Sequence, residues 1–210
     1  MQNYYDPTTT EEAARLMLSV ADKYRGNNNF EYDLVDIVRQ SLSDRGRIVY
    51  NQTIADFKSF DKKSFSAHSK EFLDILLAQD ELLATRPEFK VGRWIKQAKD
   101  KGLTEEEKKL YEWNARVQIT TWGNRVCADD GGLRDYAHKE WNGILKDFYY
   151  KRWSEYWKTL QDVLDGKPEV KLDYYAMEEP WTLDNKFYPY EAEGDCIDVA
   201  KDVFKRVFGM

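Results

Sequence analysis

Residues 61–83 read DKKSFSAHSKEFLDILLAQDELL, and their apolar side chains return every three or four positions. This spacing places them on one face of an α-helix, with charged and polar side chains on the opposite face. The apolar face is made of Phe65, His68, Phe72, Ile75, Leu76, Leu82 and Leu83. Pro87 disfavours helical backbone in the residue before it, so this helix is expected to follow Asp61 and to end near Arg86.

The flanking sequence carries helical patterns on both sides of this segment. Helices are expected over about 8–25, 31–60, 87–102, 104–123, 133–164 (with an irregularity near 148–150) and 195–208. Residues 124–132 are expected to form a polar loop, and residues 166–194 to be irregular. Thr104 precedes Glu107 with the spacing of a capping box, which predicts a helix start there. No run alternates apolar and polar residues over the length of a strand, and no internal repeat is visible. The sequence therefore predicts an all-α fold, an irregular bundle of about six to seven helices, with residues 1–210 forming a single domain.

Composition and charge limit the classes of function. The 210 residues include 32 Lys and Arg against 38 Asp and Glu, a net charge of −6, whereas a nucleic-acid-binding protein normally presents a basic surface. An apolar share of 42% is too high for a disordered chain. No stretch approaches about 18 consecutive apolar residues, so no membrane span is expected. Residues 1–6 do not read as a signal peptide. Neither nucleic acid nor a membrane is therefore an expected partner.

Cysteine and histidine are too few and too scattered to predict a metal site. Cys127 and Cys196 lie far apart without metal-ligand spacing, so two free thiols are favoured over a disulfide between them. The chain has two histidines, and a multi-histidine site is not expected. Asp129 and Asp130 lack the spacing of a calcium-binding loop and the glutamate that completes one.

The sequence also lacks the common motifs for a serine nucleophile, a zinc protease or a phosphate-binding loop. Carboxylates remain as candidate reacting groups, and glycoside hydrolysis requires two of them facing each other across a pocket. A chain with this many acidic residues forms such pairs by chance, so no catalytic dyad is nominated. More unusual are residues 112–123 and 133–141, where polar side chains stand among bulky apolar ones. Taken alone, these stretches favour a packed seam between two helices.

Several motifs nevertheless occur together in a recognisable order. The central ones are Arg-x-Gln-x-Thr-x-Trp-Gly at 116–123, Asp-Tyr-Ala at 135–137 followed by Lys139, Trp141 and Gly143, and Tyr-Tyr-x-Arg-Trp at 149–153. Flanking ones are Tyr-Asp-Leu at 32–34 with Arg-Gln at 39–40, Phe-x-x-Gly-x-Trp at 89–94, and Gly-Asp at 194–195 with Asp-x-Ala-Lys at 198–201. On these residues the chain, from about 32 to 208, resembles the C-terminal helical domain of glycoside hydrolase family 89, the α-N-acetylglucosaminidases.

The resemblance implies a parent protein with a small N-terminal domain, a (β/α)8 barrel and this all-α domain. The catalytic glutamates of the family belong to the barrel, so no catalytic residue is expected in this chain. The implied reaction is the retaining hydrolysis of terminal α-linked N-acetylglucosamine from glycans, without a metal or an organic cofactor. Animal members act on heparan sulfate in the lysosome and bacterial members on other glycans. The parent is therefore expected to be secreted, periplasmic or lysosomal. The sequence of this chain alone does not indicate a localisation.

In the family the helical domain packs on the barrel and closes one side of the substrate pocket. The motifs carry Trp122, Leu133 and Tyr136 over as substrate-binding residues. An indole face can stack on a sugar ring, a phenol can hydrogen-bond a sugar hydroxyl, and a leucine supplies an apolar contact beside them. This sequence departs from the family in a longer loop before Leu133 and in having leucine where the family has isoleucine. Arg116 is expected to be structural, in a buried or interfacial pair with a carboxylate.

Two alternatives from other classes stay open at this point. The chain could be a stand-alone helical module that binds a protein or a carbohydrate without catalysis, using the groove near Trp122. It could also be a self-sufficient enzyme, which requires two carboxyl groups roughly 5 to 10 Å apart in one pocket.

Overall fold

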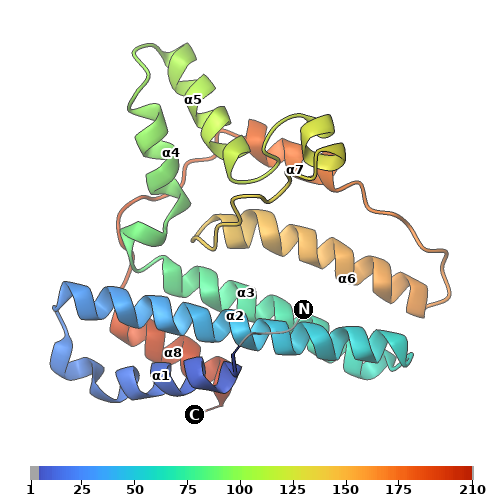
Figure 1. Ribbon diagram of the computed structural model, residues 1–210, viewed down its shortest axis with the longest axis horizontal. Helices are drawn as coiled ribbons and strands as arrows, with labels where there is room; N and C mark the ends of the chain where they lie inside the picture. Colours follow the sequence, from blue (N-terminus) through green and yellow to red (C-terminus); the bar gives the residue numbers. More distant parts are fainter. Residues whose placement is uncertain (1–4, 210) are drawn as a thin grey trace.

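The computed structural model describes residues 5–209, whose secondary structure is helical, with irregular connections and no β-strand (Figure 1). Lys90 and Asn142 form an isolated bridge. The helices are α1 (Pro7–Val20), α2 (Asn28–Lys58), α3 (Lys62–Leu83), α4 (Val91–Lys99), α5 (Glu105–Gln118), α6 (Tyr150–Leu164), α7 (Tyr174–Leu183) and α8 (Cys196–Phe208). The all-α prediction is confirmed. In the described part of the chain, no helix is both long and apolar enough to cross a lipid bilayer.

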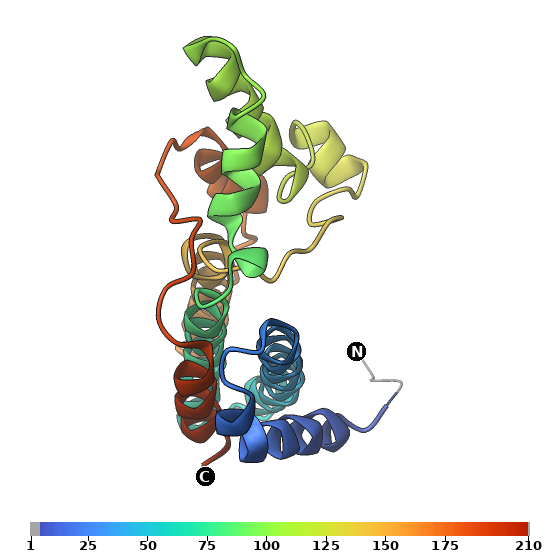
Figure 2. The same cartoon turned by 90° about the vertical axis from the view of Figure 1, so that its left-hand side faces the viewer.

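The base of the molecule is a bundle of α1, α2, α3 and α8 (Figures 1 and 2). Helices α2 and α3 are the longest elements and pack side by side along their lengths. Each begins at a side-chain cap, Asn27 for α2 and Asp61 for α3, which accepts a main-chain N–H of the first turn. Most of the buried apolar side chains form one contiguous cluster that includes residues of α1 and of α8.

Helix α6 lies along this base (Figure 1). Contacts between aromatic rings attach it to α2 and α3. Phe72 of α3 meets Trp153 at a centroid distance of 4.8 Å and Trp157 at 5.5 Å, both edge to face. Tyr50 of α2 contacts the same two indoles at 5.7 and 5.8 Å. Edge-to-face pairs of this kind fix ring orientation as well as burying area. The start of α6 is therefore held firmly over the base.

Helices α4, α5 and α7 form the upper part of the molecule (Figure 1). The predicted capping box at the start of α5 is present, with Thr104 and Glu107 each bonding the other's main-chain N–H. Helix α4 runs against the segment before α8, where a Cβ on Gly92 would stand 2.3 Å from the Pro189 carbonyl oxygen. This approach requires glycine, which accounts for the motif residue at that position.

The expectation of one helix over 133–164 is wrong. Residues 133–143 are irregular, a π-helical turn covers Leu145–Tyr149, and α6 begins at Tyr150. The irregularity expected near 148–150 overlaps the end of that π turn. A distant residue interrupts the helical pattern: the buried Asp80 carboxylate accepts the main-chain N–H groups of Gly143 at 2.7 Å and Lys146 at 3.1 Å. These bonds fix the segment before α6 in place of a helical continuation.

Three other expected boundaries differ. Helix α5 ends at Gln118 and not near Trp122, and Pro87 lies in a separate 3₁₀ turn (Pro87–Phe89) ahead of α4. The expectation that residues 166–194 are irregular is wrong for Tyr174–Leu183, which form α7 and raise the number of α-helices in the described part of the chain to eight. Its start is capped by Asp173, and Pro180 falls inside its last turns. The buried Trp181 beside that proline donates from Nε1 to the Tyr188 hydroxyl at 2.9 Å, so tertiary packing outweighs the local helix-breaking signal.

Candidate functional site

Trp122 and Tyr136 lie against each other at the surface, with ring centroids 5.3 Å apart and planes inclined by 57°. Trp122 is 39% exposed and Tyr136 is 73% exposed. The half-buried Leu133 belongs to the same turn, because the Tyr136 N–H donates to its carbonyl at 3.0 Å. The structure thus brings the three sequence-nominated residues together. An aromatic pair this open can form one side of a ligand site but cannot enclose a ligand by itself.

The turn that follows α5 presents Trp122 to solvent. The Trp122 N–H donates to the Val117 carbonyl at 2.8 Å, and its φ of +63° turns the chain sharply away from the helix. A bulky residue in this left-handed region costs roughly 1–2 kcal/mol, so the surroundings must hold it there. Thr120 and Thr121, just before it, are buried and anchor the turn.

The predicted polar loop at 124–132 contains a compact π-helical turn, Val126–Asp130. This turn supports the next segment, because Leu133 and Arg134 donate their N–H groups to the carbonyls of Cys127 and Ala128. Cys127 is exposed and Cys196 is buried, and both are free thiols, as favoured from the sequence. Within the described residues, no group of three or more potential ligand side chains could hold a metal ion.

Behind the aromatic pair lies a polar network that sequence reasoning missed. Asp135 has a φ of +61°, and its N–H donates to the Thr120 carbonyl at 2.8 Å. Its carboxylate accepts the Tyr149 hydroxyl at 2.5 Å and forms an ion pair with Arg152. Arg152 reaches on to Glu178 of α7, with Nε 2.6 Å from Oε1. The available signal was that Asp135 and Arg152 belong to two of the recognised motifs, although nothing in the sequence indicated that these motifs touch.

Charge and burial act in opposite directions in this network. Burial raises the pKa of Glu178, and the guanidinium of Arg152 opposes that rise without cancelling it. Burial would lower the pKa of Arg152, but the charges of Asp135 and Glu178 outweigh it and raise that pKa. Burial and the neighbouring Asp135 carboxylate both raise the pKa of the Tyr149 hydroxyl, which stays protonated and donates. The Asp135 carboxylate is occupied by Tyr149 and Arg152, and Arg152 is also paired with Glu178, which suits this network to supporting the backbone.

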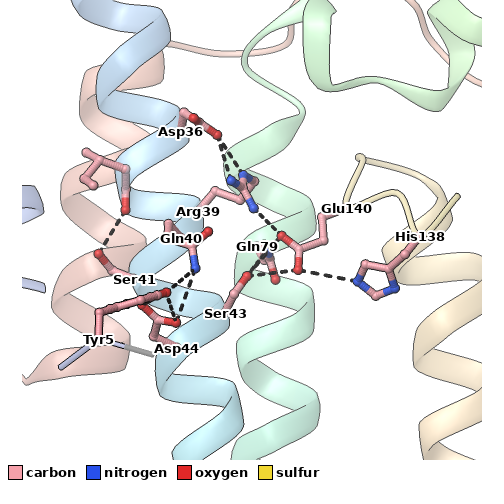
Figure 3. Close-up of polar contacts among 11 residues, drawn as sticks. Tyr5, Asp36, Arg39, Gln40, Ser41, Ser43, Asp44, Gln79, His138 and Glu140 are labelled. Carbon is pink, nitrogen blue, oxygen red and sulfur yellow. Dashed lines mark hydrogen bonds and ion pairs between the residues drawn. The ribbon is translucent and has the colours of Figure 1, made fainter. Parts of the chain in front are cut away.

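A second polar cluster ties residues 138–140 to the base (Figure 3). The Glu140 carboxylate pairs with Arg39 of α2 and accepts hydrogen bonds from Ser43 and from Gln79 of α3, the last at 3.0 Å. Burial would raise the pKa of Glu140, but the neighbouring His138 and the charge of Arg39 lower it to about 2. The segment that follows Tyr136 is thereby fixed to two helices of the base.

Arg116 is fully buried and structural, as the sequence indicated. Its guanidinium forms two bonds to Oε1 of Glu112, at 3.1 and 2.8 Å. It also donates to the carbonyls of Trp181 and Lys186, and its plane lies near the rings of Trp181 and Tyr188. Arg116 thus joins α5 to α7 and to the segment after α7.

A cavity of about 470 Å³ lies between the start of α6 and α7, and Asp147 and Glu178 are among the residues that line it. A self-sufficient glycosidase would need two carboxyl groups free to react in one such cavity. Asp147 is instead paired with Lys186 and Glu178 with Arg152. Because each carboxylate is already bound to a cation, the geometry favours a structural use of both.

Comparison with known proteins gives consistent matches. Residues 1–206 match the family model described as the α-N-acetylglucosaminidase C-terminal domain. The human α-N-acetylglucosaminidase is 30% identical over 98% of this chain and 28% of its own length. A family 89 glycoside hydrolase from Clostridium perfringens, solved with 2-acetamido-1,2-dideoxynojirimycin, is 33% identical with a TM-score of 0.91, over 97% of this chain and 24% of that one. The same figures hold for a structure of the C. perfringens enzyme with its substrate GlcNAc-α-1,4-galactose. The chain thus spans about a quarter of the length of these relatives.

Proposed function

This chain belongs to the family of α-N-acetylglucosaminidase C-terminal domains, and we propose that it is the helical domain of a glycosidase that removes terminal α-linked N-acetylglucosamine. Residues 1–210 form one domain in this proposal, in keeping with the contiguous apolar cluster that joins α1 to α8. The reacting carboxyl groups belong to a (β/α)8 barrel elsewhere in the parent chain. The lengths of the relatives leave room for such a barrel, since this chain matches only 28% of the human protein.

The observation that carries the proposal is the exposed contact between Trp122 and Tyr136. Two large rings that lie together at the surface, with Leu133 beside them, form an amphipathic patch of the kind that marks a binding surface. Trp122 stacks on the sugar ring, Tyr136 hydrogen-bonds a hydroxyl or the acetamido group, and Leu133 contributes an apolar contact. These residues orient the glycan against the barrel and transfer no proton.

The test compares two exposed tryptophans of the same region in the full-length protein. Trp113 of α5 is 42% exposed, close to the 39% of Trp122, and serves as the matched control. With GlcNAc-α-1,4-galactose as substrate, Trp122→Ala is expected to lower kcat/KM about tenfold or more, because the substrate loses its orientation. Trp113→Ala should stay within about twofold of wild type. Equal losses in the two variants, or none in either, would remove Trp122 from the site.

A second measurement tests the division of labour within the parent. The full-length protein should release N-acetylglucosamine from the same disaccharide, and the 210-residue chain alone should not. Binding of a peptide or protein by the chain, with no hydrolysis by the full-length protein, would favour a stand-alone interaction module instead.

A further inference from the structure

We infer that Asp135 is a positioning residue, which sets Tyr136 against Trp122 by joining the end of α5 to α6 and α7. The inference rests on the proposed function, since it assigns a role within the same site. Asp135 directs its carboxylate to Tyr149 and Arg152.

Both aromatic side chains depend on one main-chain junction. The N–H of Asp135 donates to the Thr120 carbonyl at 2.8 Å, which joins the turn after α5 to the turn that contains Tyr136. Trp122 follows Thr120 by two residues and Tyr136 follows Asp135 by one. Both Trp122 and Asp135 have left-handed backbone, with φ of +63° and +61°. A change of backbone at Asp135 therefore moves the two rings relative to each other.

The Asp135 carboxylate fixes that junction to rigid parts of the fold. It accepts the Tyr149 hydroxyl at 2.5 Å and pairs with Arg152, one residue on the π turn before α6 and the other on α6 itself. Tyr149 is buried, and Arg152 is also paired with Glu178 of α7. A strained backbone conformation persists only where the surroundings over-determine it. The Thr120 carbonyl, the Tyr149 hydroxyl and the Arg152 guanidinium together meet that requirement at Asp135.

Tyr136 has less support of its own. It is mostly exposed, its ring contact is with Trp122, and its N–H bonds within the turn, to Leu133. The carboxylate of Asp135 is committed to Tyr149 and Arg152 behind the turn, so it is not offered to a sugar. Asp135 thus acts through Tyr136 and does not act as a catalytic residue.

The substitution Asp135→Asn removes the negative charge of the carboxylate and changes little else at that position. Asparagine adopts left-handed backbone as readily as aspartate and retains one carbonyl oxygen as an acceptor, but it cannot form the ion pair with Arg152. A matched control is Asp44→Asn on α2, because Asp44 also accepts a tyrosine hydroxyl, that of Tyr5 at 2.8 Å (Figure 3). This control removes a buried negative charge beside a tyrosine hydroxyl in the base of the molecule, so it should lower stability and leave kcat/KM unchanged.

The decisive experiment is a double-mutant cycle in the full-length protein, using GlcNAc-α-1,4-galactose. Asp135→Asn is expected to lower kcat/KM about tenfold in the wild-type background, because misplacement of a positioning group by about 1 Å carries losses of up to a hundredfold. In the Tyr136→Ala background the same substitution should change kcat/KM by less than about twofold. Such non-additivity is expected only if Asp135 works through Tyr136.

The outcomes separate this inference from the proposed function. Equal losses from Asp135→Asn in both backgrounds would indicate a merely structural role and overturn the inference alone. Wild-type kcat/KM in Tyr136→Ala would overturn the substrate-binding role of Tyr136. The positioning claim is then decided by a crystal structure of full-length Asp135→Asn: it stands if the rings move apart and falls if the 5.3 Å centroid distance is kept.

Discussion

The substitution Arg116→Cys provides a quantitative test of how α5 and α7 are held together. Arg116 is 0% exposed and Glu112 is 2% exposed, so the pair lies out of contact with water. Removing the guanidinium deletes the two bonds to Glu112 at 3.1 and 2.8 Å. It also deletes a 2.8 Å bond to the Lys186 carbonyl and leaves a gap beside the ring of Trp181.

The expected loss in the free energy of unfolding depends on the Glu112 carboxylate that remains buried after the substitution. Removing one partner of a buried ion pair costs about 3–5 kcal/mol, mainly because the other charge stays buried and unpaired. Lys99 still reaches the second oxygen of Glu112 at 2.6 Å, which places the expected cost toward the lower end of that range. For a domain of this size, each 1 kcal/mol lowers Tm by roughly 2–4 °C. We therefore expect Arg116→Cys to melt about 6–15 °C below wild type.

The assay is thermal unfolding of the 210-residue chain followed by far-UV circular dichroism. Two further variants check the mechanism. Arg116→Lys keeps a positive charge but loses the planar fork, and should fall between wild type and Arg116→Cys. Adding Glu112→Gln to Arg116→Cys removes the buried negative charge that Arg116 no longer balances, and should recover part of the lost Tm. A Tm for Arg116→Cys within about 2 °C of wild type would refute this reasoning.

Two other predictions concern segments that support the site. Gly143→Ala should lower stability by about 2–4 kcal/mol, because Gly143 has a φ of +92° and an added Cβ would stand 2.8 Å from the Tyr188 ring; a Tm unchanged in calorimetry would contradict this. Glu140→Gln should weaken the pH dependence of stability at acid pH. A carboxyl group whose pKa is lowered from 4.5 to about 2 stabilises the fold above pH 4.5, and that contribution is lost as the pH falls toward 2. Denaturant unfolding at several pH values should show a smaller loss over this window in Glu140→Gln than in wild type, and parallel curves would disprove the assignment.

Local signals in the sequence located most of the helices. Helices α3, α5 and α8 begin after Asp61, Thr104 and Asp195, where a short polar side chain caps the first turn. Such a cap needs partners only two or three residues away, so it can be read without knowledge of the fold. The clear amphipathic pattern of residues 61–83 likewise corresponds to a single continuous helix.

The mispredicted segments depend on partners far along the chain. Residues 133–143 have a helical pattern of apolar residues, but Asp80 takes the N–H groups of Gly143 and Lys146 from more than 60 residues away. Helix α7 contains Pro180, a local signal against helix, and forms around the buried Trp181. The periodicity of apolar residues reports only on local structure, so it cannot predict either contact.

The candidate site divides in the same way. Motif resemblance predicts Trp122, Leu133 and Tyr136 as site residues, and the structure places them next to one another. The residues behind them, Asp135 and Arg152, could not be assigned a use, because their contact joins two motifs separated by an irregular segment. Periodicity and motif spacing identify the residues at the surface of a site more readily than those that hold it in place.

The central claim is that this chain positions the sugar while a barrel elsewhere in the parent cleaves it. The most direct measurement is kcat/KM of the full-length protein carrying Trp122→Ala and Tyr136→Ala together, on GlcNAc-α-1,4-galactose. The account predicts a loss of about a hundredfold with helical content and Tm close to wild type, because both side chains are exposed. A kcat/KM within about twofold of wild type would contradict it.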